Sequence, residues 1–176
     1  MIQSKRSARS TRFPVAMHLM TMLAMVELRE GPIFLSSAWM AHRADKNQAA
    51  LRLLLGKLSK AGLIETAAGS RGGARVAKGA REITCLEIYK AVEHDSLFGV
   101  HEGNPECLIS TYVGGFMESF FDEAEHRFER ELKGVCLADV ADNLNATAIA
   151  EGFEPPPFHE PAPSRAKGKG VQKDKI

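Results

Sequence analysis

Between residues 47 and 62 the chain alternates apolar and polar positions with the period of a helix. The apolar side consists of leucines, namely Leu51, Leu54, Leu55 and Leu58. The opposite side carries Gln48, Arg52 and Ser59, so the predicted helix has a polar face that can contact a partner. Asn47 is a good N-cap residue and Gly62 suits the position after the last turn, so we expect the helix to lie between them.

Shorter sequence patterns on either side of this helix predict the elements that precede and follow it. Upstream, Ser36 is a natural N-cap for a short helix that contains Trp39, which we expect to pack in the core. Downstream, apolar residues flank a glycine-rich turn at 69–73 with Arg71 at its tip, a pattern typical of a two-stranded hairpin. Two helices followed by such a wing form a winged helix-turn-helix, a DNA-reading fold.

Helices are also predicted before and after this unit. One spans residues 12–28 and ends before Gly31, and its expected core positions are Phe13, Met17, Met20 (or Leu19), Leu23 and Val26. Thr84-Cys-Leu-Glu87 is a capping box that begins a helix through about residue 92. A final helix is expected over 137–150.

The longest predicted helix lies before Gly134 and carries an apolar stripe of about six turns. Its members are Ile109, Val113 (or Tyr112), Phe116, Met117, Phe120, Phe121, Ala124, Phe128 and Leu132. One small domain cannot bury this much aromatic surface alone.

Taken together, the predicted elements give the fold class that we expect: mainly α with a small β-wing, a winged helix-turn-helix domain followed by a long helix.

Charge divides the chain into two unlike parts, although the net charge is only +1. Residues 1–83 hold 14 Lys and Arg against 5 Asp and Glu, a net of +9, whereas residues 84–151 hold 4 against 14, a net of −10. A basic first half attracts a polyanion such as DNA, and an acidic second half is kept away from it.

Other features of the sequence bear on membrane insertion, location and disulfide bonding. The chain has no run of about 18 uninterrupted apolar residues, so we expect no membrane span. The apolar segment 13–28 is interpreted as a core helix of a cytoplasmic protein. Three cysteines at wide spacing, positions 85, 107 and 136, do not form a disulfide framework.

Several motifs together resemble the Rrf-two (Rrf2) family of bacterial winged-helix transcription regulators. They are the run "LxxLLxxLxKAGLI" that ends at Ile64, the "GxxGG" wing at 69–73, the segment RVAK at 75–78 and the segment REITCLEIYKAVE at 81–93. The resemblance covers roughly residues 10–150. It departs from the family pattern at Ala74, where an aromatic residue is usual, and at Ala68, where an arginine is common.

The resemblance implies a domain organisation. Residues 1–83 would form the winged helix-turn-helix domain with a basic N-terminal arm, and 84–151 a helical dimerisation and sensor region. The long helix would pack against its counterpart in a homodimer, with the final helix packed on this dimerisation region. Residues 152–176, rich in Pro and Lys, are expected to be a disordered tail.

Candidate DNA contacts lie in the basic half. Arg43 and Lys46, in the turn before the second helix, are placed for phosphate contacts, while Gln48 and Arg52 are candidates for reading base edges. Arg71 on the glycine turn can reach a minor groove or a phosphate. The full predicted set is Arg43, Lys46, Asn47, Gln48, Arg52, Arg71 and Arg75.

Cys107 is the one candidate for a sensor. Members of the resembled family that bind an iron-sulfur cluster use three closely spaced cysteines in this loop, and here only Cys107 lies there, so we expect a cluster-free member. With Asn104 as N-cap and Pro105 at the first position, Cys107 would lie in the first turn of the long helix, where the helix dipole lowers a thiol pKa. A thiol sensor and an unreactive packing cysteine both stay open.

The sequence favours a homodimeric, sequence-specific DNA-binding regulator, a repressor acting on an imperfect palindrome, and it leaves open a redox or thiol response through Cys107. The alternative is a winged-helix protein-interaction module without specific DNA binding. A metal site at His94, His101, Glu102 and Cys107 fits no zinc spacing, and an enzyme using Cys107 with His101 lacks an acid-base constellation, so we expect neither metal nor catalysis.

Overall fold

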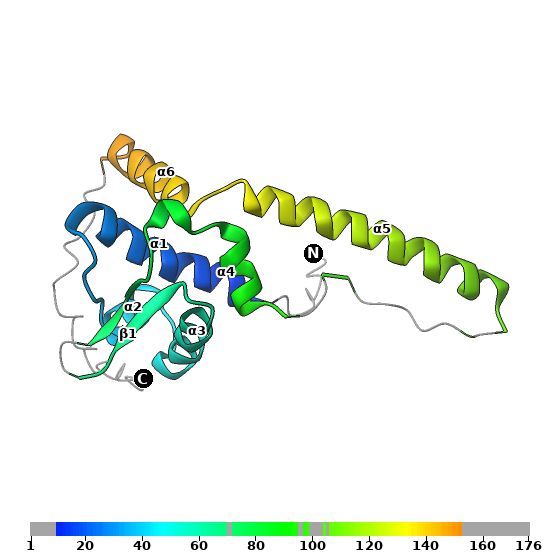
Figure 1. Cartoon of the computed structure of the whole chain (residues 1–176), viewed down its shortest axis with the longest axis horizontal. Helices are drawn as coiled ribbons and strands as arrows, with labels where there is room; N and C mark the ends of the chain where they lie inside the picture. The colour runs from blue at the N-terminus through cyan, green and yellow to red at the C-terminus, as the bar shows by residue number, and fades with distance from the viewer. Residues whose placement is uncertain (1–9, 70–71, 95–96, 99–103, 105, 153–176) are drawn as a thin grey trace, which may run out of the picture.

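The computed structural model describes residues 10–69, 72–94, 97–98, 104 and 106–152. Its elements, in chain order, are α1 (Arg12–Glu30), α2 (Ser37–Arg43), α3 (Gln48–Lys60), β1 (Ile64–Ala67), β2 (Gly73–Val76), the 3-10 turn η1 (Ala80–Glu82), α4 (Cys85–Val92), α5 (Leu108–Lys133) and α6 (Leu137–Ala150). The mainly helical fold with a small two-stranded wing, and the helix-turn-helix before it, are confirmed (Figure 1).

Helix α1 is the centre of the core. It contacts α3, α4, α6, η1 and β2, and it is therefore buried on several sides rather than along one stripe. This is why Ala16, Thr21 and Ala24 are buried in addition to the expected Leu19, Met20, Leu23 and Val26, whereas Phe13 and Met17 are only partly buried at its edge. The helix runs two residues past its predicted end and stops at Gly31, whose φ of 84° favours glycine.

The wing is a short antiparallel pair in which Ile64 faces Val76 and Ala67 faces Gly73. Leu35 adds a bridge on the other side of β2, where its N–H donates to the carbonyl of Ala74 (2.8 Å) and its carbonyl accepts from the N–H of Ala74 (2.9 Å). A side chain at Gly73 would collide with the carbonyl of Leu35, so this position requires glycine. The wing is thereby attached to the start of α2.

Helix α4 begins with the expected capping box. The hydroxyl of Thr84 accepts from the N–H of Glu87 (3.2 Å), and the Glu87 carboxylate accepts from the N–H of Thr84 (2.8 Å). Burial alone would raise the pKa of Glu87, but hydrogen bonds from Lys78 and Thr84 outweigh it and lower that pKa. Cys85 is buried, as expected for a small apolar residue.

Helix α6 was expected to pack on the dimerisation region, and within its own chain it packs on α1 and η1. Leu137, Ala138 and Ala141 lie in the same core as α1 to α4. A backbone bridge between Thr84 and Cys136 holds its start, with the N–H of Leu137 donating to the carbonyl of Ile83 (2.7 Å). The physical reason is that these buried residues fill a space beside α1 that the first 83 residues leave open.

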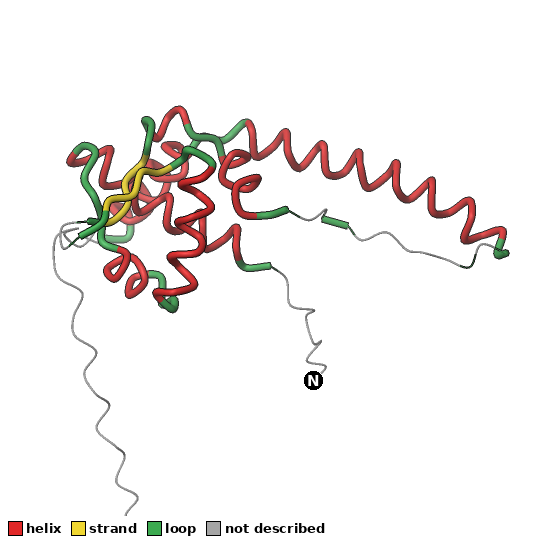
Figure 2. The backbone as a smooth tube through the Cα atoms, turned by 60° about the horizontal axis from the view of Figure 1, so that its bottom comes forward, coloured by secondary structure: helices red, strands yellow, loops and turns green. Residues whose placement is uncertain are grey.

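Helix α5 projects from this core as a single rod, as both views of the backbone show (Figures 1 and 2). At about 1.5 Å per residue, its 26 residues extend roughly 39 Å. Near its carboxyl end it packs on α4, where Tyr89 and Phe128 meet edge to face at 5.3 Å and Lys90 pairs with Glu129 at 2.9 Å. Toward its amino end large apolar side chains are exposed: Leu108, Ile109, Tyr112, Val113, Phe116 and Phe120.

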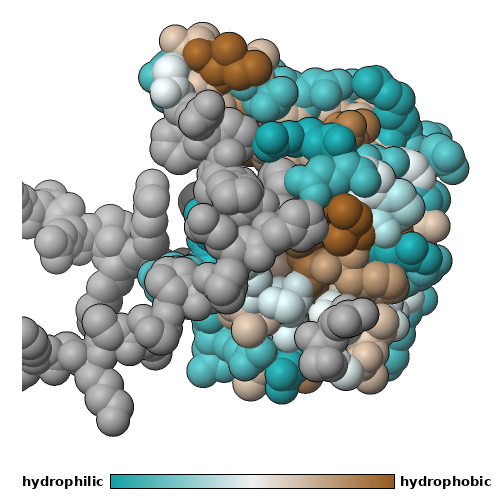
Figure 3. Space-filling view, turned by 90° about the vertical axis from the view of Figure 1, so that its left-hand side faces the viewer, coloured by the Kyte–Doolittle hydropathy of each residue, from teal (hydrophilic) through white to brown (hydrophobic). Residues whose placement is uncertain are grey.

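The surface of the domain that surrounds the core differs from the exposed apolar half of α5. At the end of the molecule shown in Figure 3 the described surface is mostly hydrophilic, and its apolar patches are small and separate. Among the helices that the structure describes, none has both the length and the apolar character needed to cross a bilayer.

Candidate nucleic-acid interface

Helix α3 is held in place by its leucines and by a capped first turn. Leu51, Leu54, Leu55 and Leu58 are all buried, and the side-chain oxygen of Asn47 accepts from the N–H of Ala49 at 2.8 Å. Gly62 follows the helix with φ of 71°, as predicted for the position after the last turn. These local features leave the opposite face of α3 directed outward, with Ala49, Arg52, Leu53, Gly56 and Lys60 exposed.

A groove of about 510 Å³ lies between α3, the start of α2 and the wing. Arg52, Gly56 and Ser59 of α3 line one side, Ser36 and Ser37 another, and wing residues 66–69 and 72–73 the third. The bridge between Leu35 and Ala74 fixes the distance between wing and helix pair. A helix and a wing held in this way can contact adjacent grooves of a duplex.

Two cations are exposed before α3: Arg43, predicted in the turn, is the last residue of α2, and Lys46 lies in the turn itself. Arg43 lies over the ring of Trp39, with its guanidinium carbon 5.1 Å from the ring centroid, and Trp39 is buried as the sequence predicts. The backbone N–H of Lys46 donates to the carbonyl of Ala41 (3.0 Å), which closes the turn and leaves its side chain exposed. Both cations therefore lie directly before the first turn of α3.

Two predicted contacts have partners within the chain. The amide of Gln48 donates to the hydroxyl of Ser37 (3.3 Å), so this half-buried side chain joins α3 to α2. The guanidinium of Arg75 donates to the carboxylate of Glu65 (2.9 and 2.7 Å) and to the carbonyl of Pro32 (3.3 Å), and it lies over the ring of Phe34. Arg71 lies outside the described residues.

Leu53 is an outward-facing residue that the sequence pattern did not single out. Its side chain is 74% exposed and follows Arg52 directly in the sequence. The sequence contains one signal that could have identified it: Leu53 is the one leucine of this helix that lies off the apolar stripe. A leucine on a DNA-reading helix can pack against the methyl group of thymine.

The predicted position of Cys107 is wrong. Helix α5 begins at Leu108 with Cys107 as its N-cap residue, so the thiol is not in the first turn. Asn104 caps the preceding turn instead, since its side chain accepts from the N–H of Glu106 (3.0 Å). The half-buried Cys107 is not in a disulfide.

The described part of the chain offers neither an activated thiol at Cys85 nor a cluster of metal ligands. Burial, and then the nearby Cys136 and Asp139, raises the pKa of Cys85, which disfavours its thiolate. In the part of the chain that the structure describes, no three side chains of His, Cys, Asp or Glu gather to hold a metal. His101 and Glu102, which the metal and enzyme alternatives need, lie outside it.

Known proteins are similar to this chain in sequence or in structure. The YwnA protein of Bacillus subtilis (strain 168), named as an HTH-type transcriptional regulator, is 30% identical over 137 residues that cover 77% of this chain and 98% of YwnA. A transcriptional regulator from Lactobacillus plantarum has a similar structure, with a TM-score of 0.64, 17% identity, and coverage of 81% of this chain and 95% of that one. The global cysteine regulator CymR of B. subtilis gives a TM-score of 0.55 at 22% identity, with coverage of 78% and 98%.

The family model Rrf2, described as "Iron-dependent Transcriptional regulator", matches residues 9–143. This range includes α3, the wing, α4 and all of α5. With the winged fold, the groove beside α3 and the identity to YwnA, it leads to one conclusion: this chain belongs to the Rrf2 family of transcriptional regulators.

Proposed function

We propose that this protein is a homodimer that binds an imperfect palindrome and represses transcription by occluding a promoter. Each subunit would place α3 in the major groove of one half-site and its wing beside the next groove. The observation that carries the proposal is the exposed face of α3 beside the groove that α2 and the wing complete. The excess of positive charge in residues 1–83 supports a polyanionic partner.

The proposed contacts divide into two kinds. Arg52 and Leu53 would read base edges, with Gln48 near them, and Arg43 and Lys46 would bind phosphates before α3. The side chain of Asn47 caps the helix, which leaves its amide nitrogen for a phosphate. Arg71 is proposed as the wing contact. For Arg75, the remaining predicted contact, we propose instead a role in shaping the wing, because its guanidinium has partners in Glu65 and Pro32.

The exposed half of α5 supports a homodimer. Phe116 is 70% exposed and Tyr112 72% exposed, in a helix whose other end is packed on α4. Patches of large apolar side chains of this kind mark interaction surfaces. A second α5 can cover them with like residues, and Gly114 and Gly115 would allow the two helices to approach closely.

A signal acting at Cys107 or at α5 would change the spacing of the two α3 helices and so release DNA. Oxidation or alkylation of the Cys107 thiol is the proposed input, because this residue lies where the chain enters α5. We propose a cytoplasmic location and no catalytic activity.

Footprinting of the purified protein on genomic promoter fragments tests the proposal. We expect protection of two half-sites about one helical turn apart. Phe116→Glu should give a monomer by sedimentation and lose this protection, while Glu118→Gln, a change on the same exposed stretch of α5, should keep it. Equal binding of all fragments at low salt would instead favour the protein-interaction module. Repeating the footprint with Cys107→Ser and an oxidant tests the sensor.

A further inference from the structure

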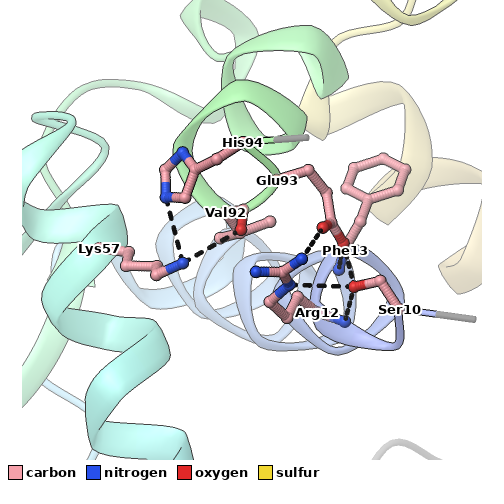
Figure 4. Close-up of polar contacts among 7 residues, drawn as sticks. All are labelled: Ser10, Arg12, Phe13, Lys57, Val92, Glu93 and His94. Carbon is pink, nitrogen blue, oxygen red and sulfur yellow. Dashed lines mark hydrogen bonds and ion pairs between the residues drawn. The ribbon is translucent and has the colours of Figure 1, made fainter. Parts of the chain in front are cut away.

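Lys57 connects the DNA-reading helix to the end of α4. Its ammonium donates to the carbonyl of Val92 (3.3 Å) and lies 3.2 Å from Nε2 of His94 (Figure 4). Val92 is the last residue of α4, where carbonyls lack partners within the helix and a cation is favourable. Lys57 is half-buried against this helix.

Glu93, the residue after Val92, connects the end of α4 to α1. The Glu93 carboxylate accepts from the hydroxyl of Ser10 (2.6 Å) and the N–H of Phe13 (3.1 Å), and it pairs with Arg12 (2.9 Å) (Figure 4). Its side chain is only 10% exposed. Residues 92–94 therefore hold α1 and α3 together at one point.

Other residues of α4 hold α5. They form the edge-to-face pair of Tyr89 with Phe128 and the ion pair of Lys90 with Glu129. A continuous set of contacts thus runs from α5 through α4 to α3.

We propose that Lys57 is a positioning residue that sets the orientation of α3, and that α4 and residues 92–94 pass a displacement of α5 to the DNA-reading helix. The inference rests on the proposed function for its effect on DNA binding. The competing role for Lys57 is a phosphate contact. The two differ, because a positioning residue affects operator DNA selectively, whereas a phosphate contact affects every sequence and the salt dependence of binding.

The first test compares Lys57→Met with Lys60→Met, which removes the same charge from an exposed position one turn on. We expect Lys57→Met to lower operator affinity about tenfold, the size typical for loss of a charged hydrogen bond, with the salt dependence of the wild type. Lys57→Arg should restore most of the affinity, and Lys60→Met should have little effect on operator preference. Equal losses on operator and random DNA, with a salt slope smaller by about 1, would overturn the positioning role.

Amide hydrogen exchange of the DNA-free protein gives a readout that does not depend on DNA binding. Lys57→Met should speed exchange in α3 and at residues 92–94, and Lys60→Met should not. If the wild type prefers no DNA fragment, the proposed function fails, but this measurement still decides the positioning role. Unchanged exchange in Lys57→Met would overturn it.

The route through α4 is tested by a double-mutant cycle with Glu129→Gln, at concentrations where sedimentation shows each variant to have the oligomeric state of the wild type. This change weakens the link between α5 and α4. We expect it to lower operator affinity in the wild type and to have a clearly smaller effect when Lys57 is already Met. Additive effects, or no effect of Glu129→Gln, would exclude transmission by this route.

Discussion

Arg75 and Glu65 face each other across the two strands of the wing, and the guanidinium donates two hydrogen bonds, of 2.9 and 2.7 Å, to one carboxylate oxygen. The carbonyl of Pro32 and the ring of Phe34 complete the surroundings of this arginine. It therefore joins the wing to the segment between α1 and α2, and this segment leads to Leu35 and its bridge with Ala74.

We expect Arg75→Met to destabilise the fold slightly, by up to about 1 kcal/mol for a partly exposed ion pair, and to leave the salt dependence of DNA binding unchanged. Urea unfolding and salt titrations of operator binding measure the two effects. Glu65→Gln is the matched control, since it disturbs the same pair without removing a cation. A salt slope smaller by about 1 in Arg75→Met alone would show that Arg75 binds a phosphate after all.

Arg52 and Lys46 are expected to play different roles although both are exposed cations. Arg52→Ala should reduce operator affinity by about 1 to 3 kcal/mol and relax base preference at one position of each half-site. Lys46→Ala should weaken binding to all sequences alike and reduce the salt slope. Competition binding with a library of single-base operator variants distinguishes them. Equal losses on operator and random DNA for Arg52→Ala would contradict base reading.

Leu53 should read a thymine methyl group if α3 lies in the major groove. Replacing the contacted thymine by deoxyuridine removes one methyl group and should lower affinity about fourfold, because burying such a group contributes about 0.8 kcal/mol. In Leu53→Ala the same DNA change should have almost no effect. The measurement is a scan of single deoxyuridine replacements across the operator. An identical scan in the two proteins would rule out this contact.

The cysteines should differ in reactivity. Burial raises the pKa of Cys85, as do Cys136 and Asp139, so its thiolate is rarer at a given pH and its side chain is also inaccessible. The half-buried Cys107 should therefore be alkylated before Cys85 at neutral pH. Mass spectrometry of iodoacetamide-treated protein follows each site, with urea-unfolded protein as the reference. Modification of Cys85 first in the folded protein would contradict this order.

Much of the fold could be predicted because its signals are local. The leucine spacing of α3, the caps at Asn47 and Ser36 and the box of Thr84 with Glu87 all act within one or two helical turns. Each depends on backbone geometry that neighbouring residues impose. The winged fold and the family therefore followed from residues 36–93.

The partners of long side chains could not be predicted in the same way. Lys57 meets a carbonyl 35 residues away and Arg75 one 43 residues away, and neither residue carries a local mark of that contact. In a sequence pattern, a lysine on a solvated face and a lysine at a helix end look alike. Only the packing of α4 beside α3 separates them.

The sequence by itself determined the order of helices, the wing, the family and the opposite charges of the two halves, since spacing, caps and composition are properties of the chain. The tertiary structure decided that α6 joins the core beside α1, that Cys107 precedes the first turn of α5, and that Gln48 joins α3 to α2. These depend on which surfaces meet once the helices of the core have buried their apolar sides. That choice is made by the whole core together, because α1 offers apolar residues on several sides and its neighbours must share them.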